Sequence, residues 1–171
     1  MAPLVVLIGA PGAGKTTVGR VLAEQLGVGF RDSDADVEAR ADATITEIFV
    51  DEGEEGFRRR EREAVRDALQ THTGVLALGG GAVEDTETRA DLEGRTVVLL
   101  SVGASEAAKR AGISGPRPLL LGNVRTRWLG QLRRREPIYE QCARFTVATD
   151  HRTVVDIVDE SNRELATVEW L

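Results

Sequence analysis

The fold of this chain is decided by Leu4-Val5-Val6-Leu7-Ile8-Gly9-Ala10-Pro11-Gly12-Ala13-Gly14-Lys15-Thr16-Thr17. The apolar residues predict a buried strand, the glycines predict a tight loop, and a helix is predicted over Lys15–Leu26. The loop matches the pattern G-x-x-x-x-G-K-[ST] in the strand–loop–helix setting that this pattern requires. Its backbone N–H groups and the helix N-terminus can hold phosphate oxygens, Lys15 can reach the β- and γ-phosphates, and the Thr16 hydroxyl can ligate Mg²⁺. The sequence therefore predicts a nucleoside triphosphate site, and an incidental glycine-rich turn is disfavoured.

Short apolar stretches alternate with amphipathic helices along the rest of the chain, which predicts a parallel sheet with helical crossovers. The length of 171 residues is that of one domain. Strands are predicted at Leu4–Ile8, Gly29–Arg31, Val75–Leu78, Thr96–Val102 and Phe145–Ala148. Helices are predicted at 15–26, after a Thr44-x-x-Glu47 capping box, and at about 54–72, 86–93, 104–111, 124–141 and 153–167.

The charge balance restricts the kinds of partner. The chain has 22 basic and 28 acidic residues and a net charge of −6, which disfavours nucleic acid or an anionic membrane as the main partner. The single cysteine, Cys142, excludes a disulfide framework and a multi-cysteine zinc site. No apolar run approaches the roughly 18 residues of a membrane span, and the first strand is too short for a signal peptide. We therefore expect a cytoplasmic protein.

Two carboxylates follow the second predicted strand in the sequence Asp32-Ser33-Asp34. Ligands of parallel α/β sheets bind at the carboxyl ends of the strands, so both side chains are expected to face the phosphate-binding loop. One could hold Mg²⁺ or its waters, and the other could accept a proton from a substrate hydroxyl. The alternative is that an aspartate caps a helix beginning near Ala35. The spacing alone leaves both interpretations open.

Glycines and arginines supply the remaining polar candidates. Gly79-Gly80-Gly81 follows the third predicted strand, where it could admit a ligand close to backbone N–H groups or form a plain turn. The arginine-rich stretches 58–62 and 133–135 could be solvated helical faces. However, Arg58 stands three residues before Glu61, an acidic residue on an otherwise apolar stripe, which predicts an inward ion pair with an oriented guanidinium. The segment 112–118, with two glycines and two prolines, predicts a mobile loop between helices.

Taken together, these motifs resemble the shikimate kinase family, P-loop kinases of the nucleoside-monophosphate-kinase-like group. The matching segments are GAPGAGKTT, DSD at 32–34, GFRRRE at 56–61, LGGGAV at 78–83, RPLL at 117–120 and REPIY at 135–139. The resemblance implies a three-layer α/β/α P-loop kinase fold with a central five-stranded parallel sheet. It also implies one domain over residues 1–171, substrate-binding helices at about 33–62, and a mobile lid at about 112–123.

The same resemblance implies an enzyme that transfers the γ-phosphoryl group of ATP to the 3-hydroxyl of shikimate, a step of aromatic amino-acid biosynthesis. It implies ATP and shikimate as ligands, Mg²⁺ as cofactor, and a monomer. By resemblance, the catalytic residues are Asp34, Lys15 and Arg117, and the metal residues are Thr16 and Asp32. The implied shikimate-binding residues are Asp34, Arg58, Gly79, Gly80, Gly81 and Arg135, with Glu61 orienting Arg58. The implied ATP-binding residues are Gly12, Ala13, Gly14, Lys15, Thr16, Thr17, Arg110, Arg117 and Arg152.

Other functions remain as alternatives. Adenylate and other nucleoside monophosphate kinases share the phosphate-binding loop, but two carboxylates after the second strand suit a hydroxyl acceptor better than a phosphate. A gluconate kinase is disfavoured by the glycine run and the arginine pair. A GTP-binding switch needs an N-K-x-D segment, and the only lysines, Lys15 and Lys109, do not follow an asparagine. An inactive nucleotide-binding scaffold has no support, because all the expected polar groups are present.

Overall fold

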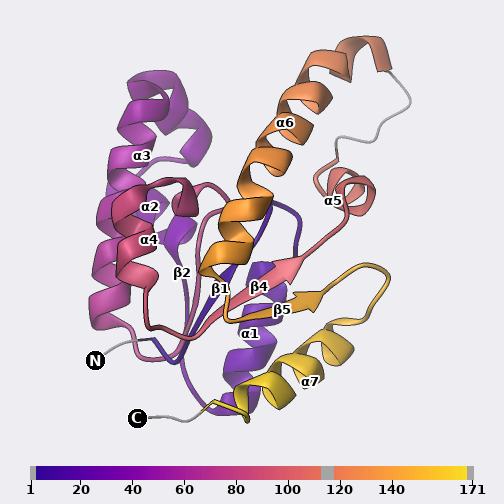
Figure 1. The fold of residues 1–171 in the computed structure, drawn as a ribbon. Helices are drawn as coiled ribbons and strands as arrows, with labels where there is room; N and C mark the ends of the chain where they lie inside the picture. The colour runs from indigo at the N-terminus through magenta and orange to yellow at the C-terminus, as the bar shows by residue number, and fades with distance from the viewer. Residues whose placement is uncertain (1–2, 113–117, 169–171) are drawn as a thin grey trace.

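The computed structural model describes residues 3–112 and 118–168, with the backbone alone for 118–123. Each strand is followed by one or two helical elements, as Figure 1 shows. In chain order the elements are β1 (Val5–Ile8), α1 (Lys15–Leu26), β2 (Phe30–Asp32), α2 (Ser33–Ala41), α3 (Ile45–Thr71), β3 (Val75–Ala77), the 3₁₀ turn η1 (Ala82–Glu84), α4 (Thr86–Leu92), β4 (Val97–Ser101), α5 (Ala104–Arg110), α6 (Pro118–Cys142), β5 (Phe145–Ala148) and α7 (Val154–Leu165).

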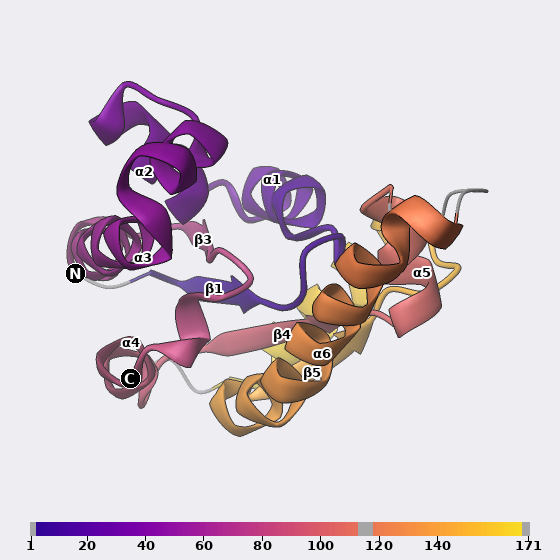
Figure 2. The ribbon, with the colours of Figure 1, turned by 90° about the horizontal axis from the view of Figure 1, so that it is seen from above.

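The five strands form one parallel sheet in the order β2-β3-β1-β4-β5, which confirms the predicted sheet. Every residue of β1 and β3 is buried, as expected for strands covered on both faces. Seen from above, β3, β1 and β4 follow one another in the order of the sheet (Figure 2). In Figure 1, α1 and α7, which pack against each other, lie on one side of the sheet, and α3, α4 and α6 lie on the other. These layers confirm the predicted α/β/α architecture. Because all strands run in parallel, the segments that follow β1, β2 and β3 meet at one edge of the sheet.

Some helix boundaries differ from the sequence prediction. Thr44 does form the predicted capping box with Glu47, but the helix that it starts continues to Thr71 as α3. The chain bends inside α3 at Gly53, whose φ of 71° and ψ of −177° are not helical. Helix α6 begins at Pro118 rather than near 124; proline suits the first turn of a helix because its missing N–H would be unpaired there anyway.

These boundaries bear on the expected lid at about 112–123. Residues 113–117 of that stretch, including Arg117, lie outside the described residues, and residues 118–123 form the first turns of α6.

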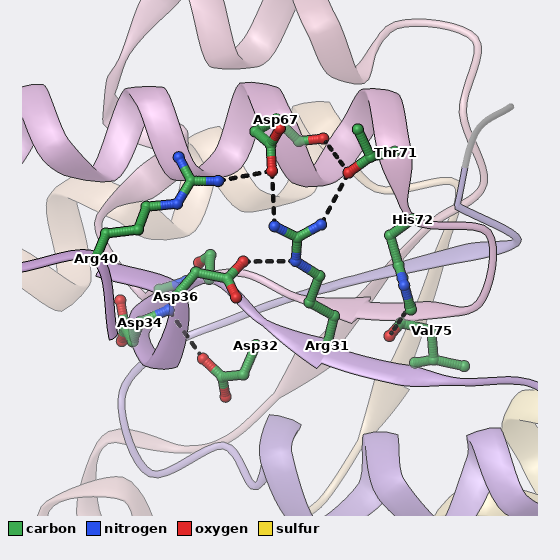
Figure 3. A network of polar contacts seen from close by, with 11 residues as sticks. Arg31, Asp32, Asp34, Asp36, Arg40, Asp67, Thr71, His72 and Val75 are labelled. Carbon is green, nitrogen blue, oxygen red and sulfur yellow. Dashed lines mark hydrogen bonds and ion pairs between the residues drawn. The ribbon is translucent and has the colours of Figure 1, made fainter. Parts of the chain in front are cut away.

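An arginine on β2 ties the two helices that follow to the sheet. The Arg31 guanidinium donates to Asp36 on α2 at 2.6 Å, and to Asp67 at 2.8 Å and Thr71 at 2.9 Å on α3. Figure 3 shows it between the two carboxylates, with Asp32 next to it on the strand. The neighbouring arginine lowers the pKa of Asp67. This network fixes α2 and α3 relative to the end of β2, from which the predicted site carboxylates project.

No helix in the described ranges combines the length and the apolar character that a bilayer crossing requires.

Candidate active site

The loop after β1 has the backbone of a phosphate cradle. Gly12 and Gly14 have φ angles of 84° and 89°, a region that other residues adopt only with strain, and Gly14 is the N-cap of α1. The Lys15 ammonium folds back over the loop and donates to the carbonyls of Gly9 at 2.7 Å and Ala10 at 3.0 Å. Ala13 and Thr17 belong to the same loop and first helical turn. All the predicted phosphate-binding residues of this segment therefore lie together.

The charge of Lys15 depends on residues from two other segments. Burial lowers the pKa of Lys15 to about 8, Asp34 and Asp32 oppose that shift, and Arg135 adds to it. Electrostatic interactions of this kind act only over short distances. The carboxylates after β2 and the arginine of α6 thus lie near the phosphate-binding lysine, although they are far from it in sequence.

Asp32 is the helix cap that the sequence offered as one interpretation, and it also contacts the phosphate-binding loop. Its Oδ1 accepts a hydrogen bond from the Asp34 backbone N–H at 2.9 Å and so caps α2, as Figure 3 shows. Its Oδ2 accepts from the Thr16 hydroxyl at 2.8 Å and so faces the phosphate-binding loop. Because the cap is at Asp32, α2 begins at Ser33, two residues earlier than predicted.

Thr16 and Asp32 fit the chemistry of Mg²⁺. Their hydroxyl and carboxylate oxygens are the hard ligands that this ion takes, and they lie in contact at the phosphate-binding loop. Among the described residues, no group of three or more His, Cys, Asp or Glu side chains could hold a metal ion. An ion bound here would therefore take most of its ligands from nucleotide phosphates and water, as Mg²⁺ usually does.

Asp34 is the least satisfied polar group of the site. Its Oδ1 is buried and has no hydrogen-bond partner among the described residues. Burial raises the pKa of Asp34 to about 6; Glu61 and Asp32 add to this shift, whereas Lys15 and Arg58 oppose it. The carboxylate is therefore mostly ionised at pH 7, and it carries a free oxygen that can accept a proton.

Gly79 has no side chain, which leaves space for the carboxylate of Asp34. A Cβ atom at Gly79 would lie 2.4 Å from Asp34 Oδ1 and 2.8 Å from Glu61 Oε1, distances that side chains cannot adopt without displacement. The Gly79 N–H donates to the hydroxyl of buried Ser33 at 3.0 Å. This bond joins the segment after β3 to the segment after β2. Ser33 was not identified from the sequence, where nothing distinguishes it from a spacer between two aspartates.

The predicted inward pair of Arg58 and Glu61 is confirmed. The Arg58 NH1 group donates to Glu61 Oε2 at 2.6 Å, and Glu61 is only 3% exposed. Burial raises the pKa of Glu61, and Arg58 is the strongest of the groups that oppose the shift. A Cβ atom at Gly81 would lie 2.4 Å from Arg58 NH1. The glycine run therefore makes room for this guanidinium as well as for Asp34.

Arg135 of α6 also lies near the glycine run, through its contact with Glu84 in η1. Arg135 is 6% exposed, and its Nε donates to Glu84 Oε2 at 3.0 Å. One helical turn later, the Tyr139 hydroxyl donates to the Gly80 carbonyl. Burial raises the pKa of Tyr139 to about 12. The structure thus brings Arg58 and Arg135 to the glycine run, together with Glu84 and Tyr139, to which sequence reasoning gave no role.

The two residues missed on this side differ in how they could have been found. Tyr139 stands four residues after Arg135, so on a predicted helix both share a face, and this spacing was a usable signal. Glu84 lies in a single 3₁₀ turn, which is too short for a periodic pattern.

The residues predicted for the adenine side are only partly brought together. Arg110 donates to the Gly12 carbonyl at 3.3 Å and to the Thr149 carbonyl at 2.9 Å, so it joins the phosphate-binding loop to the segment after β5. Arg152 instead contacts the Ala148 carbonyl at 2.9 Å and Glu160 at 2.6 Å. These partners hold it at the β5–α7 connection. Arg117 lies outside the described residues.

Comparison with known proteins agrees with this site. A family model described as "Shikimate kinase" matches residues 11–166. The chain is 55% identical to a shikimate kinase of Thermobifida fusca, with 95% of each protein covered. It is 57% identical to a shikimate kinase of Salinispora tropica, with 90% of this chain and 92% of that protein covered.

Solved structures give the same result. A shikimate kinase from Acinetobacter baumannii in complex with shikimate is similar, with a TM-score of 0.86 and 32% identity over 98% of this chain and 94% of that one. Such identity over nearly the whole length, together with a phosphate cradle beside an acidic and arginine-lined site, is specific to one family. The chain therefore belongs to the shikimate kinase family, whose members transfer the γ-phosphoryl group of ATP to the 3-hydroxyl of shikimate.

Proposed function

We propose that the reaction takes place between Lys15 and Asp34 at the carboxyl edge of the sheet. The observation that carries this assignment is the Asp34 carboxylate. One of its oxygens is buried and has no partner within residues 3–112 and 118–168, and its pKa is sensitive to both Lys15 and Arg58. A base needs a free lone pair in reach of the hydroxyl that it deprotonates. Asp34 Oδ accepts the proton of the 3-hydroxyl as the hydroxyl oxygen attacks the γ-phosphorus of ATP, and ADP leaves.

Positive charge surrounds the phosphates in this arrangement. Lys15 and the N–H groups of the loop at Gly12–Lys15 bind the phosphates, with Arg110 at the nucleotide side and Arg117 and Arg152 as further ATP-binding candidates. When bound at Thr16 and Asp32, Mg²⁺ neutralises charge on the phosphates. Phosphoryl transfer needs positioning and charge stabilisation rather than covalent chemistry from the protein, so these groups are sufficient.

The acceptor is held by its carboxylate. Arg58, oriented by buried Glu61, and Arg135 approach the glycine run from α3 and α6, which suits a guanidinium clamp on a planar anion. The backbone at Gly79–Gly81 lines the pocket between this clamp and Asp34. The clamp places the carboxylate of shikimate away from the phosphates and leaves the ring hydroxyls toward Asp34.

A substrate panel tests this function. The protein is incubated with ATP, Mg²⁺ and shikimate, gluconate or AMP in separate reactions, and ADP formation is followed by a coupled assay. Shikimate is expected to be turned over and to yield shikimate 3-phosphate on mass analysis. Turnover of AMP or gluconate without turnover of shikimate would contradict the assignment.

The remaining expectations concern the state of the protein. We expect a monomer, as the resemblance to the family implies, and a cytoplasmic location. The net charge of −6 disfavours binding to nucleic acid or to anionic membranes. Light scattering after size-exclusion chromatography should give the mass of one chain, 18.5 kDa. A mass of about twice that value would contradict the monomer.

A further inference from the structure

Glu84 lies inside the arginine clamp. Its Oε2 accepts from Nε of Arg135 at 3.0 Å and lies 3.0 Å from NH2 of the same residue. The same oxygen is 4.0 Å from NH2 of Arg58. One carboxylate oxygen thus stands between the two guanidinium groups assigned to the carboxylate of the acceptor.

The second oxygen of Glu84 is held outside the clamp. Its Oε1 accepts from Arg134 Nε at 2.8 Å and lies 2.6 Å from Arg134 NH2. Arg134 is mostly exposed, with 62% of its side chain accessible, whereas Arg135 is buried. The carboxylate therefore has one attachment in the pocket and one at the surface. Rotation toward Arg134 would release the clamp while Glu84 keeps a partner.

The acidic residues around the clamp differ in what they contact. Glu61 does not compete with a ligand for the outer edge of Arg58. It accepts from NH1 on the buried side at 2.6 Å and orients the guanidinium group. Glu54 lies 3.9 Å from Nε of Arg58 and is mostly exposed. Among these described acids, Glu84 alone contacts Arg135 and also approaches Arg58, so it is the one placed to occupy the position of an incoming carboxylate.

From this geometry we infer that Glu84 is an internal carboxylate that competes with shikimate for Arg58 and Arg135, and that it thereby sets the affinity of the clamp. The inference rests on the proposed role of these two arginines. A site that is competent in only a fraction of molecules binds its ligand more weakly by that fraction. The charge of Glu84 also lowers the attraction between the clamp and any anion.

Replacement of Glu84 by glutamine tests the inference, because the amide keeps the size and an acceptor oxygen but removes the charge. In E84Q, Kd and KM for shikimate are expected to fall by roughly threefold to thirtyfold, the range for one charge removed from a partly solvated site. The kcat should change by less than about twofold, since no group near the phosphates is altered. Kd is measured by calorimetric titration of shikimate into the full-length protein.

Two variants separate charge from other effects. E87Q removes a carboxylate of α4 that pairs with exposed Arg66, and it should leave Kd for shikimate unchanged. E84D keeps the charge, so its Kd should stay closer to that of the wild type than to that of E84Q. A gain in E84D as large as in E84Q would overturn a competition based on charge.

An anion without a hydroxyl acceptor gives a second readout. Sulfate should inhibit E84Q competitively against shikimate at lower concentrations than it inhibits the wild type. A weaker or unchanged shikimate affinity in E84Q, with the wild-type melting temperature, would show that Glu84 positions Arg135 instead, and the inference would fail. Failure of the proposed function looks different, since the wild type itself would then not phosphorylate shikimate.

Discussion

The nucleotide side and the acceptor side of the site are built in different ways. The phosphate cradle comes from one continuous segment, Gly9–Thr17, and consists mainly of backbone N–H groups and one lysine. The acceptor side is assembled from α2, α3, η1 and α6, and its parts are joined by side-chain ion pairs such as Arg58–Glu61 and Arg135–Glu84. In the proposed site, the backbone of the loop therefore binds the nucleotide, which many kinases share, whereas side chains that can be exchanged select the acceptor.

The largest expected effect is at the point where the two sides meet. In Asp34→Asn the base is lost, and kcat for shikimate should fall by about 10²- to 10⁴-fold. The affinity for ADP should remain within about twofold, because the cradle is untouched. Steady-state kinetics and ADP titration measure the two sides separately. A variant with near wild-type kcat would remove Asp34 from the mechanism, and a parallel loss of ADP binding would break the division between the sides.

Loss of one clamp residue should affect the acceptor side alone. Arg58→Ala removes a charged contact and is expected to weaken shikimate binding by roughly 2–5 kcal/mol, seen as a raised KM, while KM for ATP is unchanged. The exposed Arg59→Ala on the same helix serves as the control, since Arg59 pairs only with Glu52 among the contacts described. An unchanged shikimate KM in Arg58→Ala would contradict the clamp.

The ionised carboxylate of Asp34 should also lower the free energy of unfolding of the protein at neutral pH. Its pKa is raised from 3.8 to about 6, so between these values the native state binds more protons than the unfolded state. The free energy of unfolding therefore decreases as pH rises through this window, by up to about 3 kcal/mol for two pKa units. Asp34→Asn should be more stable than the wild type at pH 7.5, and the difference should vanish near pH 4. Urea unfolding at both pH values measures this, and equal stabilities at pH 7.5 would contradict it.

The pH dependence of activity provides the mildest test. A base with a pKa of about 6 predicts that kcat/KM decreases below pH 6, as Asp34 becomes protonated. Lys15, with a pKa of about 8 in the free protein, predicts a second decrease above pH 8 in kcat/KM for ATP. The decrease at low pH thus reports on Asp34 of the acceptor side, and the decrease at high pH reports on Lys15 of the nucleotide side. A profile that stays flat between pH 5 and 7 would remove the first assignment.

The sequence predicts the nucleotide side more fully than the acceptor side, and the reason is physical. A cradle made of consecutive residues leaves its whole pattern in one motif, and the strand-end position of Asp32 and Asp34 follows from the parallel sheet. Glu61 could be found because a charge on a buried helical stripe is conspicuous. Glu84 and Ser33 could not, since their roles depend on partners about 50 residues away, Arg135 and Gly79. Arg31 likewise gave no signal for its network with Asp36 and Asp67.

The glycine run and the phosphate-binding loop are also in direct contact with each other, which matters for engineering. A Cβ atom at Gly80 would lie 2.7 Å from Pro11 Cδ, so the loop that lines the acceptor pocket is packed directly against the phosphate-binding loop. Libraries aimed at a new acceptor can vary Glu84 and its neighbours with little risk to nucleotide affinity. At Gly80 and Pro11, by contrast, a change of size on one loop requires a compensating change on the other, so these two positions should be randomised as a pair.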